Sequence, residues 1–468
     1  MNLRFDLIIV GGGSAAFSAA IRTSELGGTA AIINTGLPTG GTCVNTGCVP
    51  SKTLIRAAET VHNANHPRFR GIDSKASITD FKVIMDQKRQ MVNDLRKAKY
   101  VDVIADDSNS TLVNGFARFV DKHLVEVDGV TYHGKNVLIA SGSTSWIPPV
   151  QGLETAGYLT NESAYELDKL PKSLIVLGGG YIALENAQLF SRLGSKVTVV
   201  QRSGHILSYQ PKQLGDTLAG FLEDEGITVM TNTRLKEVTN TADKKKVALT
   251  VNNEEMVLEA EEILVATGRV GNTALLGLDK IGIQTHGKGY IEVDQTLRTE
   301  QNHIFAAGDV LGERQFVYTA AYEGKIAAEN AMKASHVKAD FTLVPWVVFT
   351  DPQVAGVGMD EHQACSAGID VDTAKISLEH VPRSIAARDT RGYIQLIRNK
   401  ASDQLVGARI VAPEGSELLM EITLAIRHGI TVDSMKSEFH PYLTLSEGIK
   451  LAAITFGKSV DKLSCCAT

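Results

Sequence analysis

Two cysteines in a glycine-rich segment are the residues of this sequence best suited to chemistry. The segment, Gly-Gly-Thr-Cys-Val-Asn-Thr-Gly-Cys-Val-Pro-Ser-Lys, spans residues 40–52 and contains Cys43 and Cys48 with four residues between them. If the chain after Cys43 is helical, both sulfurs lie on one face about one turn apart, close enough to form a disulfide. A dithiol that closes to a disulfide releases two electrons. The spacing therefore predicts a redox-active pair, and other parts of the chain must supply and receive its electrons.

A second cysteine pair, Cys465 and Cys466, stands two residues from the end of the sequence. Adjacent cysteines at a chain end cannot serve a core, so we expect their reactivity to be their purpose. They could pass electrons to a protein disulfide, or they could capture a soft metal ion. Either role requires a tail that reaches Cys43 and Cys48. The fifth cysteine, Cys365, stands alone and is predicted to be an ordinary thiol.

The composition excludes several classes of partner. The 468 residues are 43% apolar and 21% charged, with a net charge of −6, which is ordinary for a soluble globular protein and gives no reason to expect nucleic acid or an anionic membrane as partner. No apolar run approaches the ~20 residues of a membrane span, and the N-terminus lacks the pattern of a signal peptide. A cytoplasmic location is therefore expected, where clustered cysteines indicate catalysis or metal binding.

A dinucleotide-binding pattern at the start of the chain leads into the first cysteine pair. Residues 5–10 predict a buried parallel strand, and residues 15–26 predict the helix that follows. Between them, Gly11, Gly13 and Ala16 form a Gly-x-Gly-x-x-Ala motif. The first glycine permits a tight turn, the second lets the backbone approach a pyrophosphate, and the small third residue packs the helix on the strand. These features predict a dinucleotide site beside the cysteines.

The same pattern occurs a second time. Residues 174–177 predict a strand, and Gly178 and Gly180 open another Gly-x-Gly-x-x-Ala motif and helix. The next predicted strand, residues 196–200, leads to Arg202. An acidic residue there would repel a 2′-phosphate, whereas an arginine can pair with it. The second unit is therefore predicted to bind NADP(H) rather than NAD(H); the alternative is that Arg202 is an ordinary surface arginine.

Two further strand ends carry polar residues suited to a dinucleotide. The strand at residues 30–33 ends at Asn34, where an acidic residue often binds a ribose hydroxyl; an amide bonds it less strongly than a carboxylate. A strand beginning near residue 302 ends at Asp309, a position from which a carboxylate commonly binds a sugar-chain hydroxyl. Because Asp309 follows the second unit, the first unit is expected to resume after it.

The remaining stretches predict supporting structure. Residues 51–100 predict charged helices with a solvated face. Residues 111–140 alternate apolar and polar side chains and predict an antiparallel hairpin. Residues 341–468 contain three predicted strands followed by a helix over residues 416–428, which indicates a third unit of α+β type.

Taken in order, these motifs resemble those of the flavoprotein disulfide reductases. The resemblance rests on the segment 40–52, the two glycine motifs, Ala-Thr-Gly-Arg at 266–269 and Ala-Ala-Gly-Asp at 306–309. It spans essentially the whole chain. It implies an α/β fold with two Rossmann-like dinucleotide-binding domains, for FAD and NADPH, and a C-terminal α+β dimerisation domain. It also implies a homodimer in which the partner's C-terminal domain completes each active site.

The resemblance implies domain boundaries. Residues 1–150 are expected to form the first part of the FAD-binding domain, and residues 151–270 the NADPH-binding domain. Residues 271–340 are expected to form the second part of the FAD-binding (central) domain. Residues 341–468 are expected to form the dimerisation domain with its Cys-Cys tail.

The resemblance also implies roles for individual residues. Cys48 would stack against the flavin, and Cys43 would exchange with the substrate. Lys52 would lie near the flavin ring and pair with Glu185, and Tyr181 would cover the nicotinamide face of the flavin and move as NADPH enters. Ser141 replaces the threonine of the common Ala-Thr-Gly and, like Asn34, departs from the usual pattern of the family. The implied cofactor-binding residues are Gly11, Gly13, Ala16, Asn34, Gly41, Thr42, Lys52, Ser141, Gly142, Asp309, Gly178, Gly180, Arg202 and Gly268.

The segment 439–447 bears on the substrate. Members of the family that reduce organic disulfides resemble His-Pro-Thr-x-x-Glu here, because the histidine delivers a proton to the leaving thiol. Alignment on Thr444 and Glu447 puts Tyr442 in that position, and His440, two residues earlier, would point elsewhere. A tyrosine keeps its proton at neutral pH, so it is a poor proton shuttle, but it can contact a metal–thiolate complex.

This combination resembles the family members that reduce Hg(II) to Hg(0). Hg(II) is a soft cation that prefers two thiolates in a line. Such a complex releases the ion slowly, and exchange from one thiol pair to the next solves this problem. The tail pair would take Hg(II) from small-thiol complexes and pass it to the inner pair of the partner subunit. The residues expected to act in catalysis are Cys43, Cys48, Lys52, Glu185, Tyr181, Tyr442, Cys465 and Cys466. The expected metal ligands are Cys43, Cys48, Cys465 and Cys466.

The sequence also leaves two other functions open. A thioredoxin-reductase-like enzyme can end in Ser-Cys-Cys, but it requires a proton-transferring base where Tyr442 stands. A flavoprotein that binds or senses soft metals without turnover would not need Lys52, Glu185 or an NADPH site.

Overall fold

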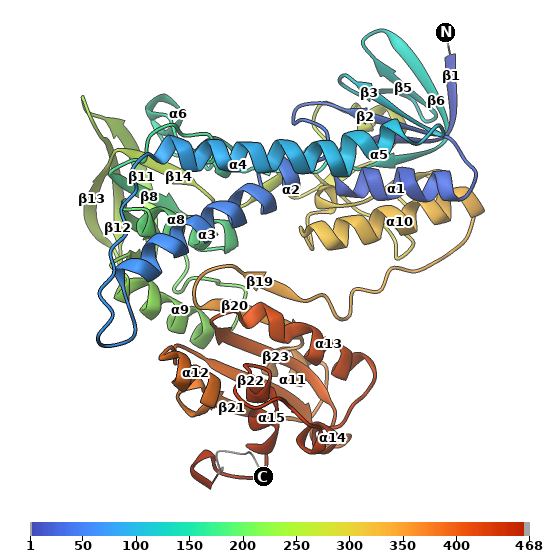
Figure 1. Cartoon of the computed structure of the whole chain (residues 1–468). Coiled ribbons are helices and arrows are strands. Elements are labelled where there is room, and N and C mark those ends of the chain that lie inside the picture. Colours follow the sequence, from blue (N-terminus) through green and yellow to red (C-terminus); the bar gives the residue numbers. More distant parts are fainter. Residues whose placement is uncertain (1, 463–468) are drawn as a thin grey trace.

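A computed structural model of the chain describes residues 2–462. In Figure 1 the first dinucleotide unit lies at the upper right, the second at the left, and the C-terminal domain below them. Cys465 and Cys466 lie outside the described residues. Within residues 2–462, none of the helices has the length and apolar character needed to cross a bilayer.

The first unit is built on a largely parallel sheet. Strands β3, β2, β1 and β6 run parallel in that order, and β18 pairs in parallel with the end of β6. Antiparallel β5 and β4 extend the sheet from the first part of β6. Their bounds are β1 (Asn2–Val10), β2 (Ala30–Asn34), β3 (Ser110–Asn114), β4 (Arg118–Asp121), β5 (Leu124–Val127), β6 (Val130–Ile139) and β18 (Ile304–Ala306). Parallel strands buried on both faces appear as continuous apolar runs, and Leu7, Ile8 and Ile9 are fully buried. Helices α1 (Ser14–Glu25) and α10 (Val317–Lys333) pack side by side on one face (Figure 1).

The antiparallel hairpin predicted over residues 111–140 is confirmed for strands β5 and β6, which turn at Asp128 and Gly129. Its first part is wrong, because Ser110–Asn114 pairs in parallel with β2 and forms the outer strand of the first sheet. The adjacent residues Leu112 and Val113 pack against the apolar clusters on the two opposite faces of the sheet. The pairing of this short strand therefore depends on tertiary packing, which the local sequence pattern does not reveal.

The second unit repeats the parallel arrangement. Its sheet has the order β10-β9-β8-β14, and an antiparallel sheet of order β11-β12-β13 lies beside it. The bounds are β8 (Ser173–Leu177), α8 (Tyr181–Arg192), β9 (Lys196–Val200), α9 (Lys212–Asp224), β10 (Thr228–Met230), β11 (Thr233–Asn240), β12 (Lys245–Val251), β13 (Glu254–Ala260) and β14 (Glu262–Val265). The ends of β8, β9 and β14 thus share one edge, where a dinucleotide is bound in such sheets.

The C-terminal domain is an antiparallel sheet covered by helices. The strand order is β19-β20-β23-β22-β21. The bounds are β19 (Trp346–Val348), β20 (Gln353–Gly358), β21 (Val371–Ser377), β22 (Tyr393–Asn399), β23 (Leu405–Ala412), α13 (Leu419–Arg427), α14 (Val432–Ser437) and α15 (Glu447–Ile454). The helix predicted over residues 416–428 begins as a 3-10 turn, so the α-helix starts only at Leu419.

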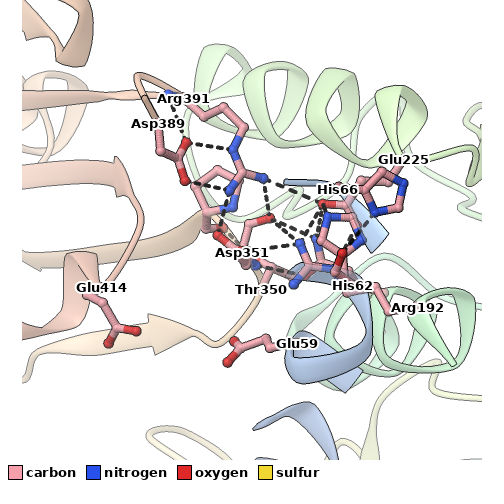
Figure 2. Close-up of polar contacts among 12 residues, drawn as sticks. Glu59, His62, His66, Arg192, Glu225, Thr350, Asp351, Asp389, Arg391 and Glu414 are labelled. Carbon is pink, nitrogen blue, oxygen red and sulfur yellow. Dashed lines mark hydrogen bonds and ion pairs between the residues drawn. The ribbon is translucent and has the colours of Figure 1, made fainter. Parts of the chain in front are cut away.

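Buried ion pairs join the second unit to the C-terminal domain (Figure 2). Arg192, at the end of α8, pairs with Glu225 at 2.6 Å and with Asp351 at 2.9 Å. Arg391 pairs with Asp351 at 2.9 Å and with Asp389 at 2.8 Å. The side chains of Arg192 and Glu225 are only 3% and 9% exposed. Because buried charges are costly unless paired, the network fixes how these two parts pack.

The helix that begins at Cys48 ends against this network. His62, in its last turn, and His66, just beyond its end, stack with ring centroids 4.3 Å apart, and Figure 2 shows them beside Glu225. Burial, assisted by the charge of Arg192, lowers the pKa of His62 to about 4. The imidazole is therefore neutral at pH 7 and adds no charge to the network.

Replacing Arg192 by Met should destabilise the protein. The change removes the buried partner of the carboxylates of Glu225 and Asp351. The free energy of unfolding should therefore fall by about 3–5 kcal/mol, and the thermal unfolding midpoint should fall with it. The matched control is Lys82→Met, whose pair with Asp86 is 56% and 49% exposed and should contribute about 1 kcal/mol or less. Similar small shifts in both variants would contradict the role given to the network.

Candidate active site

The dithiol lies where two helices meet. Helix α2 (Gly41–Asn45) contains Cys43, and helix α3 (Cys48–Asn65) begins at Cys48. The continuous helix considered from the sequence is therefore interrupted at Thr46 and Gly47. The side chains of Cys43 and Cys48 are nevertheless hydrogen-bonded to each other, and both are free thiols.

Local packing explains the interruption. The amide of Asn45 donates to the carbonyl of Gly41 (2.8 Å) and to that of Pro38 (2.9 Å), which closes α2 on itself. A Cβ on Gly47 would lie 3.0 Å from the carbonyl oxygen of Thr42. A side chain at this position would therefore require the backbone between the two cysteines to shift by a few tenths of an ångström.

The two thiols differ in acidity. The hydrogen bond from Cys43, assisted by the charge of Lys52, lowers the pKa of Cys48 to about 7 against the effect of burial. The same hydrogen bond, together with burial, raises the pKa of Cys43 far above its usual range. Near neutral pH, Cys48 therefore carries thiolate character while Cys43 keeps its proton.

Lys52 lies one turn beyond Cys48 on α3 and pairs with Glu185 of α8. The Nζ and Oε2 atoms are 2.7 Å apart, and Glu185 is 8% exposed. The other carboxylate oxygen accepts a hydrogen bond from the backbone N–H of Phe349 (3.0 Å), and the Lys52 ammonium lies 4.5 Å from the centre of the Phe349 ring. This buried carboxylate thus keeps a cation beside the dithiol.

A cavity of about 810 Å³ connects the first glycine motif with both cysteines. Pockets that hold small molecules and cofactors span about 300–1,000 Å³. Ala16 and Lys52, which were also expected to bind the cofactor, do not line this cavity. Ala16 is fully buried on the face of α1 that packs in the core of the first unit. The expected cofactor residues that line it are Gly11, Gly13, Asn34, Gly41, Thr42, Ser141, Gly142 and Asp309.

The cavity wall fits a dinucleotide. Gly41 has a φ of 64°, and a Cβ there would lie 2.6 Å from the Cα of Gly13. The absence of a side chain at Gly41 therefore lets the chain before Cys43 pack against the start of α1, where N–H groups favour a phosphate. The hydroxyl of Ser141 is buried and has no hydrogen-bond partner among residues 2–462, so it is free to bond a ligand.

Two carboxyl groups lie just beyond strand β18, one of them, Asp309, in the wall of this cavity. Asp309 accepts a hydrogen bond from the Ser143 hydroxyl (3.0 Å), and Arg269 lies 3.8 Å away. Burial raises the pKa of Asp309. Glu323 of α10, which sequence reasoning missed, accepts a hydrogen bond from the N–H of Gly308 (2.6 Å), and burial raises its pKa to about 7. The sequence around it carries no distinguishing signal, because the same helix also contains Lys325 and Glu329.

Tyr100 is a second residue that sequence reasoning missed. It lies in a π-helical turn (Lys97–Val101), with its hydroxyl 3.4 Å from that of Ser14 and its ring 4.9 Å from the ring of Phe17. Burial raises the pKa of Tyr100, and the charges of Cys43 and Cys48 raise it further. The phenol is therefore within electrostatic reach of the dithiol. The charged helical pattern around it predicted only a solvated surface.

Tyr181 begins α8, directly after the second glycine motif. Its ring stacks between those of Phe316 and Trp346, with 6.0 Å between centroids on each side. Burial raises the pKa of Tyr181 to about 12, so the phenol stays neutral. At the same sheet edge, a Cβ on Gly178 would lie 2.3 Å from the carbonyl oxygen of Ala266, and Arg202 is exposed just beyond β9.

Tyr442 is not brought to the dithiol within one chain. It lies in the loop between α14 and α15 and is 54% exposed. Figure 1 shows α14 and α15 at the far side of the C-terminal domain from α2. The imidazole of His440 is hydrogen-bonded to Glu421 (2.8 Å), and the carboxylate of Glu447 accepts from the N–H of Leu443 (3.2 Å). The other ring nitrogen of His440, Nδ1, is buried and has no hydrogen-bond partner among residues 2–462, so neither nitrogen is presented at the surface of this loop.

The sequence model of the pyridine nucleotide-disulphide oxidoreductases matches residues 5–324, and that of their dimerisation domain matches residues 344–453. The chain belongs to this family. The α/β fold class and the family predicted from the motifs are thereby confirmed. The chain is an oxidoreductase that uses FAD and NADPH.

Relatives of this oxidoreductase extend over its whole length. It is 40% identical to a mercuric reductase of Staphylococcus aureus over 99% of the chain and 84% of the relative. It is 41% identical to mercuric reductases of Bacillus cereus (100% and 74% covered) and Streptomyces lividans (99% and 98% covered). Among solved structures, the Cu(II) complex of the HOCl-induced flavoprotein disulfide reductase RclA from Escherichia coli has a TM-score of 0.88 and 27% identity, covering 98% of this chain and 100% of that one.

Replacing Cys43 by Ala should raise the pH at which Cys48 becomes a thiolate. The change removes a hydrogen bond to a charged sulfur, which contributes about 1.5–3 kcal/mol, or about 1–2 pH units. Ultraviolet thiolate absorbance of the reduced protein should therefore titrate near pH 7 in the parent, where Cys48 has a pKa of about 7, and clearly higher in the variant. Cys365→Ala, which removes an exposed thiol, is the control. An unchanged midpoint in Cys43→Ala would show that the hydrogen bond does not set the acidity.

Proposed function

We propose that this chain catalyses the NADPH-dependent reduction of Hg(II) to Hg(0). The observation that carries the proposal is the loop formed by residues 439–447. A disulfide reductase needs a proton donor for the leaving thiol. By alignment on Thr444 and Glu447, Tyr442 would stand in that position, and the two ring nitrogens of His440 are bonded to Glu421 (Nε2) or buried (Nδ1). The similarity over the full chain to proteins named mercuric reductase supports the same substrate.

The dithiol suits a soft cation. Hg(II) prefers two thiolates; Cys48 supplies one near neutral pH, and Cys43 loses its proton when it becomes the second ligand. The overall reaction is NADPH + H⁺ + Hg(SR)₂ → NADP⁺ + Hg(0) + 2 RSH, which balances atoms and charge. FAD, when bound, supplies the two-electron relay between NADPH and the metal. Hg(0) leaves because it has no strong affinity for thiolate.

The binding sites follow from the two glycine motifs. The first motif, with Gly41, Thr42, Ser141 and Asp309, would hold FAD. Gly178, Gly180 and Gly268 would hold NADPH, with Arg202 on its 2′-phosphate and Tyr181 over the nicotinamide site. The domain boundaries at about residues 150, 270 and 340 belong to the same proposal.

The matched dimerisation domain supports a homodimer with shared active sites. In this arrangement, Tyr442 and the tail pair Cys465 and Cys466 of one subunit serve the Cys43–Cys48 pair of the other. The substrate arrives as a complex of Hg(II) with small thiols. NADPH and reduced thiols support a location in the cytoplasm.

The decisive experiment follows NADPH oxidation by the purified holoenzyme when Hg(II) is added in excess small thiol, with volatile mercury trapped. Equal amounts of NADP⁺ and Hg(0) are expected. Cu(II) is tested in parallel, because the solved relative is described as a Cu(II) complex. Oxidation driven by thioredoxin or an aromatic disulfide but not by Hg(II) would indicate a disulfide reductase. Stoichiometric Hg(II) binding without volatile mercury would indicate a binding protein.

Replacing both Cys465 and Cys466 by Ala should impair turnover on bulky Hg–thiol complexes more than on Hg(II) halides. Halides are small and weakly held, so they reach the inner pair without a hand-off. The expected loss of kcat/KM is about tenfold or more on the thiol complexes, which corresponds to about 1.4 kcal/mol in the barrier. Cys365→Ala serves as the control. An equal loss on both kinds of substrate would argue against transfer by the tail.

A further inference from the structure

Lys288 stands at the tip of a short hairpin in the resumed part of the first unit. The hairpin joins β16 (Thr285–His286) to β17 (Tyr290–Ile291). Two hydrogen bonds fix its backbone. The N–H of Gly271 donates to the carbonyl of Lys288 (2.9 Å), and the hydroxyl of Thr273 donates to the carbonyl of Gly289 (2.7 Å). The tip is thereby held against residues 269–273, immediately after Gly268.

The Lys288 side chain lies beside the second dinucleotide site. Its ammonium is 3.6 Å from the centre of the Trp146 ring, and a Cβ on Gly268 would be 3.4 Å from the same nitrogen. The backbone of Trp146 is bonded to this stretch on both sides. Its backbone N–H donates to the carbonyl of Gly268 (2.9 Å), and its backbone carbonyl accepts from the hydroxyl of Thr267 (2.9 Å). The ring therefore holds the ammonium next to residues 266–268.

This position adjoins the glycine motif of the NADPH unit. A Cβ on Gly178 would lie 3.5 Å from the backbone N of Thr267 and 2.3 Å from the carbonyl oxygen of Ala266. Strand β8, which ends at the motif, pairs directly with β14, which ends just before Ala266. A dinucleotide bound across Gly178 and Gly180 therefore passes beside Lys288.

Two cations at this edge lack a carboxylate partner. Among residues 2–462, neither Lys288 nor Arg202 forms an ion pair, whereas nearby Arg269 is bonded to Ser143 and faces Asp309. Burial, and then the charge of Arg202, lower the pKa of Lys288, so the two cations are close enough to repel each other. Two unpaired positive charges near one another suit a dianionic phosphate.

We propose that Lys288 is a second cation for the 2′-phosphate of NADPH, acting together with Arg202. The inference rests on the proposed binding of NADPH to the second unit. Without a ligand, the ammonium is held over Trp146 by a cation–π contact; with the ligand, it moves to the phosphate. Because Lys288 belongs to the first unit and Arg202 to the second, the 2′-phosphate also links the two units.

The test compares two fragments of the cofactor on the oxidised holoenzyme by calorimetry: 2′,5′-ADP, which carries the 2′-phosphate, and 5′-AMP, which does not. Lys288→Gln should weaken 2′,5′-ADP binding about tenfold, a loss of about 1.4 kcal/mol, and change 5′-AMP binding little. The control is Lys280→Gln, since Lys280 is exposed nearby and forms no ion pair among residues 2–462. Unchanged 2′,5′-ADP binding in Lys288→Gln, or an equal loss for both fragments, would overturn the proposal.

A spectroscopic readout separates a binding role from a structural one. Trp146 and Trp346 are the two tryptophans of the chain, and departure of the ammonium should change Trp146 emission when 2′,5′-ADP binds. The emission change should disappear in Lys288→Gln and persist in Lys280→Gln. Arg202→Gln separates a failure of the proposed NADPH site from a failure of the role proposed for Lys288. If Arg202→Gln retains its preference for 2′,5′-ADP, the proposed NADPH site fails; if only Lys288→Gln retains it, the inference about Lys288 fails alone.

Discussion

The ion pair between Lys52 and Glu185 joins the chemistry of this enzyme to its architecture. Lys52 belongs to the helix that begins at Cys48, and Glu185 belongs to the first helix of the second unit, with 2.7 Å between the charged atoms. Glu185 also accepts a hydrogen bond from Phe349 at the start of the C-terminal domain. A carboxylate largely withdrawn from water requires such partners. One side chain therefore ties three parts of the chain together and keeps a positive charge beside the dithiol.

That charge matters because the two thiols are unequal. Cys48 receives the hydrogen bond and the field of Lys52, whereas Cys43 keeps its proton. Helix α3 is held at both ends, near Cys48 by Lys52 and near His62 by the buried ion pairs around Arg192 (Figure 2). A reactive sulfur at the first residue of a helix fixed in this way keeps its place relative to both dinucleotide units.

The C-terminal domain bears on what the dithiol acts upon. His440 is bonded through Nε2 to Glu421, its Nδ1 is buried, and Glu447 accepts from the backbone of Leu443, so the loop before α15 does not present these groups at its surface. It presents Tyr442 and Phe439 at the surface instead, the latter 99% exposed. This surface is in keeping with the proposed action on a thiolate-bound metal, since a disulfide must be protonated as it breaks.

The sequence by itself determined the two dinucleotide units, the dithiol segment and the family, because each depends on short-range patterns. Apolar runs specify buried strands, and glycines mark where backbone must turn or approach a ligand. It did not reveal Tyr100, Glu323 or Lys288, nor the break between α2 and α3 at Gly47. The acidity of Cys48 was equally hidden, since it depends on a bonded thiol and a cation held by a distant carboxylate. Only the tertiary structure decided these features, because burial and Coulomb interactions act through space rather than along the chain.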